Sequence, residues 1–288
     1  MKYLITGVKG QLGYDIVREL EKRNEHEYLA LDAAEMDITD QDRVREVITE
    51  YQPDAIFHCA AYTAVDKAED NVKACEEVNV EGTRNIAEAA REVDSKLIYL
   101  STDYVFDGTK EGMYTPEDPT NPKSVYGNTK YLGELEALKV LKHYIVRISW
   151  VFGINGHNFI KTMLKLAETH DEVSVVSDQI GSPTYTVDLA RLLVDMAHSD
   201  RYGIYHATNE GECSWADFAE YIFKANGKDT KVNHITSEEY PQKAYRPRNS
   251  RLSKDKLVEN GFDRLPTWQD AVDRYSEELN KVYVKGAK

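Results

Sequence analysis

Three residues in the middle of the chain carry the side chains that a carbonyl reduction requires. Of the 19 tyrosines, only Tyr126 is followed by a lysine four positions later, Lys130. On a helix these positions share a face, so the ammonium would lower the pKa of the phenol and help it exchange a proton with a carbonyl oxygen. Thr102 ends the strand expected before that helix, where a hydroxyl can hydrogen-bond the same oxygen. Because strand neighbours face opposite sides, we expect only one of Ser101 and Thr102 to point at the site.

A glycine-rich turn near the N-terminus is suited to hold a dinucleotide. It follows an expected strand at residues 3–6 and opens an expected helix. Glycines permit a tight turn close to a pyrophosphate, and the helix N-terminus offers free N–H groups to it. A purely structural turn is the alternative, but the strand before and the helix after favour dinucleotide binding. The residues assigned to it are Gly7, Gly10, Gln11, Leu12 and Gly13.

Asp32 stands at the end of the second expected strand, about 20 residues after the glycine turn. A carboxylate there can accept hydrogen bonds from the ribose hydroxyls of the adenosine and would repel a 2′-phosphate. We therefore expect NADH or NADPH as cofactor, with NADH favoured. Lys9, within the turn, could partly offset the repulsion.

These residues need a sheet that brings strand ends together, and the first half of the chain predicts one. Strands are expected at 3–6, 28–31, 55–59, 96–101 and 144–148, with helices at about 11–22, 40–51, 79–93 and 125–141. This alternation predicts an α/β fold with a Rossmann-type doubly wound parallel sheet, and near-continuous apolar strands are typical of a sheet covered on both faces.

The second half is less regular and predicts a smaller α/β substrate-binding domain. Helices are expected at 158–169, 187–197 and from Trp215, and strands at 173–176 and 203–206. We divide the chain into a dinucleotide-binding domain at 1–150 and a mainly substrate-binding domain at 151–288, with segments near 187–206 able to rejoin the first. After Asn233 the chain contains Pro and Arg and is less periodic, and residues 284–288 are expected to fray.

Composition narrows the class of protein. The formal net charge is −14, which disfavours nucleic acid and anionic lipid surfaces as partners. No apolar run of about 18 residues is present, so no membrane span is expected. The three cysteines have neither disulfide nor metal-ligand spacing, and we assign no metal ligand. With the first strand starting at the N-terminus there is no room for a signal peptide, and we expect a cytoplasmic protein.

A local basic cluster stands out in this acidic chain. It consists of Arg246, Arg248 and Arg251. Guanidinium groups bind a diphosphate through paired hydrogen bonds, so a small anionic ligand is indicated. The alternative is a solvated loop whose arginines pair with Glu238 and Glu239.

Five segments together resemble the dTDP-4-dehydrorhamnose reductases of the extended short-chain dehydrogenase/reductases. They are residues 10–13, 61–69, 101–108, 126–130 and 246–252, and the resemblance covers nearly the whole chain. It implies reduction of the C4 ketone of dTDP-4-dehydro-L-rhamnose to dTDP-L-rhamnose, the last step of dTDP-rhamnose biosynthesis. Tyr126 would donate the proton, Lys130 would hold the nicotinamide ribose, and Thr102 would position the ketone oxygen.

The resemblance also implies further binding residues. Asp37 and Ile38 would hold the adenine, although helix capping is an alternative for Asp37. Trp150 would contact the sugar nucleotide, although a core aromatic is its alternative. The remaining implied residues are Ala61, Tyr62 and Thr63 for the cofactor, and Thr63, Val65, Asp103, Tyr126 and the three arginines for the dTDP-sugar. Relatives are monomers or homodimers, some of them bridged by Mg²⁺, and no ligand cluster in this sequence specifies that ion.

Rival functions use the same fold. A 4,6-dehydratase of this class places Asp-Glu after the threonine, whereas here Tyr104 follows Asp103. This difference favours simple ketone reduction. A different sugar-nucleotide reductase, a 4-epimerase and a non-catalytic relative of the type that regulates methionine adenosyltransferase stay open as rivals. The intact set of threonine, tyrosine and lysine argues against the non-catalytic relative.

Overall fold

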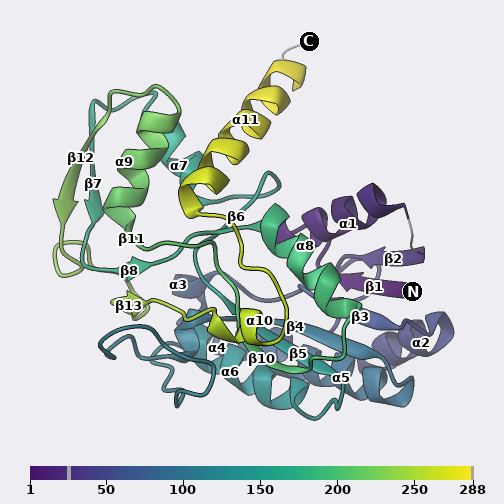
Figure 1. Ribbon diagram of the computed structural model, residues 1–288. Coiled ribbons are helices and arrows are strands. Elements are labelled where there is room, and N and C mark those ends of the chain that lie inside the picture. The colour runs from purple at the N-terminus through teal and green to yellow at the C-terminus, as the bar shows by residue number, and fades with distance from the viewer. Residues whose placement is uncertain (25–26, 287–288) are drawn as a thin grey trace.

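A six-stranded parallel sheet forms the centre of the molecule (Figure 1). The computed structural model describes residues 1–24 and 27–286. Along the sheet the order is β10-β5-β4-β3-β1-β2. β1 lies between β2 and β3, so the chain adds strands on one side of β1 and then on the other. At such a switch point the carboxyl ends of the strands leave a crevice. The strands are β1 (Lys2–Thr6), β2 (Glu27–Leu31), β3 (Ala55–His58), β4 (Lys96–Thr102), β5 (His143–Ile148) and β10 (Gly203–His206).

Helices cover both faces of this sheet, as the apolar strands predict. Successive side chains of β1 alternate between two cores: Tyr3 and Ile5 pack into one, and Leu4 into the other. The first core lies beneath α1 (Gln11–Arg23) and α8 (Thr186–Ala197). The second lies beneath α2 (Gln41–Tyr51), α5 (Gly82–Glu92) and α6 (Val125–Ala137).

The helix expected at 79–93 begins earlier than the sequence indicates. After α3 (Val65–Ala68), α4 (Val72–Glu76) continues through a π-helical segment, η1 (Glu77–Glu81), into α5. Asn79 lies in this segment, and π-helical turns are frequent at functional sites. The end of α6 also comes earlier than expected, at Ala137.

A second group of elements packs around a third core, at the upper left of Figure 1. Its helices are α7 (Phe159–Leu166), α9 (Trp215–Ala225) and α11 (Trp268–Gly286), beside the parallel pair β7 (Glu172–Val176) and β12 (Lys231–Ile235). The start of α9 has a capping box, because the Ser214 and Asp217 side chains accept each other's backbone N–H groups.

Short elements connect this group to the main sheet. They are β6 (Val151–Phe152), β8 (Ile180–Gly181), β9 (Thr184–Tyr185), β11 (Cys213–Ser214), β13 (Asn249–Ser250), η2 (Asp103–Val105) and α10 (Asp255–Glu259). β13 pairs with β8, and β9 with β6.

The less periodic part of the chain after Asn233 contains two helices. α10 and α11 both lie there, and α11 buries Ala271, Val272, Tyr275 and Leu279 at helical spacing. The spacing of these apolar residues was the sequence signal that could have predicted α11. Where fraying was expected, α11 continues through Gly286, and residues 287–288 lie outside the described part.

The segment at 186–206 lies with the six-stranded sheet. α8 packs in the same core as α1, and β10 pairs with β5 along its full length. We therefore propose that residues 1–150 and this segment together form the dinucleotide-binding domain, and that most of 151–288 forms the other. Within the described residues, no helix combines the length and apolar character needed to cross a membrane.

Candidate active site

A cleft of about 980 Å³ opens at the carboxyl ends of β1 to β5, at the switch point of the sheet. It is lined by the strand-end residues from Thr6 on β1 to Trp150 after β5. Nearly all residues predicted to bind cofactor or substrate line it. The exceptions are Tyr62, Arg246, Arg248 and Arg251.

The glycine turn is shaped by contacts that a side chain would block. Gly7 has φ +70°, and a Cβ there would lie 2.8 Å from the backbone N of Ala60. A Cβ on Gly13 would lie 2.5 Å from the carbonyl oxygen of Gly7. Gly10 precedes α1 and has no side chain to cap it, so the first N–H groups of this helix face the cleft for a ligand. These features fit a dinucleotide diphosphate.

At the outer end of the turn, Lys9 forms an ion pair with Asp32. The Lys9 ammonium, by hydrogen bond and charge, holds the pKa of Asp32 below its usual range, and the carboxylate raises the pKa of Lys9. Asp32 Oδ1 also accepts from the backbone N of Ala34 at 2.9 Å. The Asp32 carboxyl is therefore ionised. Its side chain is only 10% exposed.

Asp37 and Ile38 both line the cleft. The capping alternative for Asp37 is wrong, because Asp40 caps α2 by accepting from the backbone N of Arg43 at 3.0 Å. Asp37 Oδ1 instead accepts from the backbone N and hydroxyl of Thr39, at 2.9 and 2.8 Å. Its second carboxylate oxygen can therefore accept from a ligand in the cleft.

At the inner end of the cleft, the two hydroxyls of β4 have different partners. Ser101 Oγ donates at 2.5 Å to Glu134, which is buried and does not line the cleft. Thr102 Oγ1 donates to Asp103 at 3.0 Å, and it lies close enough to the Tyr126 phenol to lower the pKa of that group against the effect of burial. Of the two hydroxyls, Ser101 and Thr102, it is therefore Thr102 that lies next to Tyr126.

Tyr126 and Lys130 lie on one face of α6, but they do not tune each other as expected. Burial raises the pKa of Tyr126 above its usual range, with the Thr102 hydrogen bond acting in the opposite direction. Burial also lowers the pKa of Lys130 to about 7, and its Nζ lies 4.1 Å from the centroid of the Tyr99 ring. The expectation that Lys130 lowers the pKa of Tyr126 is therefore wrong in this structure, because desolvation dominates both groups.

Asp103 joins the two halves of the molecule at the cleft. Its carboxylate accepts from Ser250 of β13 at 2.5 Å and from Thr102. The residue is 3% exposed, and burial raises its pKa to about 6, against the opposing effect of those hydrogen bonds. Sequence reasoning missed Ser250, although it lies inside the segment 246–252.

Replacing Asp103 with asparagine is expected to change how stability depends on pH. The pKa of this acid is higher in the folded than in the unfolded state, so the folded protein binds more protons between about pH 4 and pH 6. Its contribution to stability is full at low pH and falls as pH rises through this window. Between pH 4.5 and pH 7, the unfolding free energy of the Asp103→Asn variant should therefore fall by about 2 kcal/mol less than that of the parent.

Urea unfolding at several pH values measures this change. Asp171→Asn, at an exposed position, is the matched control and should leave the profile as in the parent. If the unfolding free energy of the Asp103→Asn variant changed with pH in the same way as that of the parent, the raised pKa of Asp103 would be contradicted.

A buried ion pair supports the catalytic elements from below. Arg147 of β5 binds Glu134 of α6 through two hydrogen bonds of 2.8 Å, and both side chains are at most 3% exposed. Ser101 completes this group. No motif in the sequence pointed to it, because its members come from three separate elements.

Asn79 of the π-helical segment links the cofactor loop to α6. Its side chain accepts from the backbone N of Tyr62 at 2.8 Å and donates to Thr129 at 3.0 Å. Tyr62 therefore has a backbone contact that fixes the loop, while its neighbours Ala61 and Thr63 line the cleft.

Trp150 lines the cleft with an uncommon backbone conformation, φ +51°. Its indole stacks on Trp215 at 3.8 Å, and Gly181 lies flat against it, since a Cβ there would meet the ring at 2.9 Å. Val65 lines the same cleft. The ring is thus held by packing on one side and faces the cleft on the other.

The three arginines do not converge. Arg246 pairs with Asp66 at 2.6 Å, while Arg248 pairs with Glu238 at 2.9 Å. Arg251 hydrogen-bonds Asn249 at 2.8 Å and lies 3.8 Å from Glu212. The pairing of Arg248 is the one expected for a solvated loop. The guanidinium of Arg246 lies 5.8 Å from the ring centroid of Tyr104, a residue that lines the cleft.

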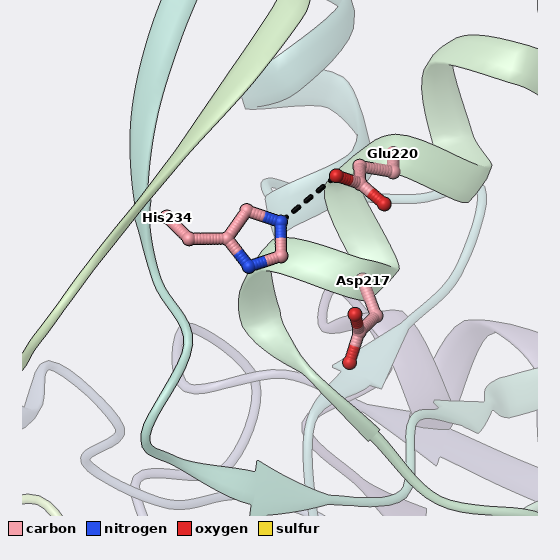
Figure 2. Close-up of side chains that lie close together, drawn as sticks. All are labelled: Asp217, Glu220 and His234. Atoms are coloured by element: carbon pink, nitrogen blue, oxygen red, sulfur yellow. Dashed lines mark hydrogen bonds and ion pairs between the residues drawn. The ribbon is translucent and has the colours of Figure 1, made fainter.

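A group of possible metal ligands lies elsewhere, on α9 and β12 (Figure 2). The side chains of Asp217, Glu220 and His234 converge there, and all three residues are exposed. Asp217 is occupied by the capping box with Ser214, and Glu220 by its 2.8 Å contact with His234. These partners account for the group without an ion.

A doubly wound parallel sheet with a threonine, a tyrosine and a lysine around the inner end of its dinucleotide-shaped cleft defines an oxidoreductase of the short-chain dehydrogenase/reductase class. The family model described as RmlD substrate binding domain matches residues 1–281. The chain therefore belongs to the RmlD family.

Relatives cover essentially the whole chain. The dTDP-4-dehydrorhamnose reductase of Aggregatibacter actinomycetemcomitans is 44% identical over 285 residues, 94% of this chain and 97% of that protein. The spore coat polysaccharide biosynthesis protein SpsK of Bacillus subtilis (strain 168) is 42% identical over 282 residues, 98% of this chain and 99% of that protein. The crystal structure of dTDP-4-dehydrorhamnose reductase from Bacillus anthracis in complex with NADP matches with a TM-score of 0.94 and 40% identity, covering 96% of this chain and 99% of that one.

Proposed function

We propose that this protein reduces the C4 ketone of dTDP-4-dehydro-L-rhamnose to dTDP-L-rhamnose with NADH or NADPH, as the last step of dTDP-rhamnose biosynthesis. The observation that carries this proposal is the placement of Thr102, Tyr126 and Lys130 at the inner end of a cleft whose outer end fits a dinucleotide. Membership of the RmlD family supports the choice of substrate.

The reduced nicotinamide supplies the hydride, and the chain supplies the proton. Tyr126 carries its proton at neutral pH, as a phenol of ordinary pKa does, so it can donate that proton to the forming C4 alkoxide. Thr102 orients the ketone oxygen, because its hydroxyl ends β4 and lines the same cleft as the Tyr126 phenol. Lys130, buried at the inner end of the cleft, holds the nicotinamide ribose.

The other assigned residues bind the two ligands. The glycine turn, Asp32, Asp37, Ile38 and residues 61–63 take the cofactor. Trp150, Val65 and Asp103 flank the sugar, and the segment 246–252 takes the diphosphate. Arg246 is best placed for this role, because one of its guanidinium nitrogens is buried beside the cleft without a hydrogen-bond partner among the described residues.

Replacing Asp32 with alanine is expected to shift cofactor use toward NADPH. The variant loses a charged acceptor for the ribose hydroxyls and a repelling charge for a 2′-phosphate, so the ratio of kcat/KM for NADPH to that for NADH should rise about tenfold. Glu50→Ala, on the exposed side of α2, is the control. An unchanged ratio would show that Asp32 does not contact the ribose.

The decisive experiment supplies dTDP-4-dehydro-L-rhamnose and follows oxidation of the reduced nicotinamide together with the sugar product. Formation of dTDP-L-rhamnose supports the proposal. Oxidation that yields a different sugar would indicate another dTDP-sugar ketoreductase, the second candidate. Bound cofactor that is not consumed, with interconversion of sugars at C4, would indicate an epimerase instead.

A further inference from the structure

The three-stranded sheet β11-β8-β13 lies beside the cleft and contacts two of the residues that line it. Gly181 of β8 and Ser250 of β13 are register partners in this sheet, and Trp215 follows directly after β11 as the first residue of α9. Gly181 and Trp215 contact Trp150, while Ser250 contacts Asp103. Trp150 and Asp103 line the cleft, whereas the residues that contact them do not. The small sheet is therefore placed to position two side chains of the cleft from outside it.

Trp150 is held in place by this sheet and by the segment that follows β8. Its φ of +51° is rare for a residue with a side chain and persists only where the surrounding structure fixes it. The carbonyl oxygen of Trp150 accepts from the backbone N of Thr184 at 3.1 Å, which fixes the main chain. Its indole stacks on that of Trp215, with ring centroids 3.8 Å apart and planes inclined by 16°. The orientation of the Trp150 ring thus depends on Trp215 as well as on its own backbone.

Gly181 provides the space that both sets of contacts need. A Cβ on this residue would lie 2.9 Å from two carbons of the Trp150 ring and 3.1 Å from Cβ of Ser250. Ser250 Oγ donates to one oxygen of the Asp103 carboxylate at 2.5 Å, and Thr102 donates to the other at 3.0 Å. Because Asp103 is buried, a carboxylate oxygen without a donor would be costly, so these bonds hold the carboxylate in one orientation. The absence of a side chain at Gly181 lets one row of the sheet hold the indole and the carboxylate together.

An aromatic ring beside a carboxylate suits a hydroxylated ring such as a sugar. The flat indole can pack against C–H groups, and the carboxylate can accept from hydroxyl groups. We propose that Gly181, Trp215 and Ser250 are positioning residues for the sugar of the substrate, the first two acting through Trp150 and the third through Asp103. The inference rests on the proposed function, which places the sugar against those two side chains. The three positioning residues then set the KM for the keto sugar, whereas the affinity for the cofactor depends on the glycine turn and is independent of them.

Gly181→Ala tests the close packing against Trp150. Either the indole or the backbone of β8 must move to admit the Cβ, so the KM for dTDP-4-dehydro-L-rhamnose should rise at least about tenfold, with kcat within about threefold of the parent. The circular-dichroism couplet that two stacked indoles produce should change in the same variant, which reports the displaced ring directly. The affinity for NADPH, measured by nicotinamide fluorescence without keto sugar, should stay within about threefold of the parent.

Trp215→Leu removes the stacking partner of Trp150 and should also raise the KM for the keto sugar about tenfold. Trp215→Phe keeps an aromatic face and should retain most of the affinity for the sugar. Tyr221→Leu is the matched control on the same helix, because Tyr221 is half-buried, packs against Trp268 and does not line the cleft. It should leave both the KM and the indole couplet as in the parent.

Ser250→Ala removes the donor to Asp103 and should raise the KM for the keto sugar about tenfold, while the indole couplet stays as in the parent. Ser253→Ala is its matched control, because Ser253 donates at 2.8 Å to Asp255, a carboxylate that does not line the cleft. The control should leave the KM unchanged.

Unchanged KM values in the folded Gly181→Ala, Trp215→Leu and Ser250→Ala variants would overturn the positioning role. Equal losses of affinity for the cofactor and for the sugar would also overturn it, because they would show a general effect on the fold. A parent protein that binds cofactor but does not reduce dTDP-4-dehydro-L-rhamnose would overturn the proposed function instead. The indole couplet of the Gly181→Ala variant would then still show whether the small sheet holds Trp150.

Discussion

Tyr126→Phe is expected to lower kcat by about 10²- to 10⁴-fold, because the variant keeps the ring and loses the proton donor. The Tyr126 phenol lies with Thr102 at the inner end of the cleft, and a phenol of ordinary pKa already carries its proton at neutral pH. Affinity for NADH should stay within about threefold of the parent, since the glycine turn and Asp32 are untouched. Steady-state oxidation of the reduced nicotinamide and fluorescence titration measure these two effects separately.

Tyr14→Phe provides the control for Tyr126→Phe. Tyr14 lies on α1 with 40% of its surface exposed and does not line the cleft. Its loss of a hydroxyl should leave turnover unchanged. Turnover near the parental rate in the Tyr126→Phe variant would refute the assignment of the proton donor, whereas loss of cofactor binding would show that the substitution acts on the fold.

Arg147→Met is expected to be the most destabilising of the substitutions considered, lowering the unfolding free energy by about 3–5 kcal/mol. Glu134 would remain buried between β5 and α6 without its charged partner. A buried carboxylate that has lost its counter-charge must either ionise in a poorly solvated site or take up a proton. Urea unfolding at neutral pH measures the loss.

The companion substitution Glu134→Leu in the Arg147→Met variant should restore much of that stability. The pair as a whole is replaceable by apolar side chains, even though removing one partner is costly. Arg45→Met is the matched control, because its 2.9 Å pair with Glu92 is exposed and should contribute less than about 1 kcal/mol. If Arg147→Met lowered the unfolding free energy by no more than Arg45→Met does, the structural role of the buried pair would be refuted.

Most residues that local sequence signals predicted for the site line one cleft. The glycine turn between a strand and a helix, the Tyr126–Lys130 spacing and the capping box of Ser214 all concern residues near each other in the chain. Their geometry follows from helix and turn rules, so the sequence was sufficient to place them. The parallel sheet was likewise predictable, because apolar runs alternated with helical patterns.

Signals that depend on burial misled the sequence analysis. Lys130 was expected to lower the pKa of Tyr126, but desolvation raises it instead. The three arginines were expected to act as one cluster from their spacing alone. Each arginine instead binds a different carboxylate or amide oxygen, and none of the three lines the cleft.

The sequence by itself determined the parallel sheet and the local placement of the proposed catalytic residues, because short-range spacing fixes local conformation. Only the tertiary structure decided their partners. Asp103 meets Ser250 across 147 residues of chain, and Lys9 meets Asp32 across the ends of β1 and β2. The physical reason is that ion pairing and desolvation depend on neighbours brought together by the packed sheet, which spacing along the chain does not encode.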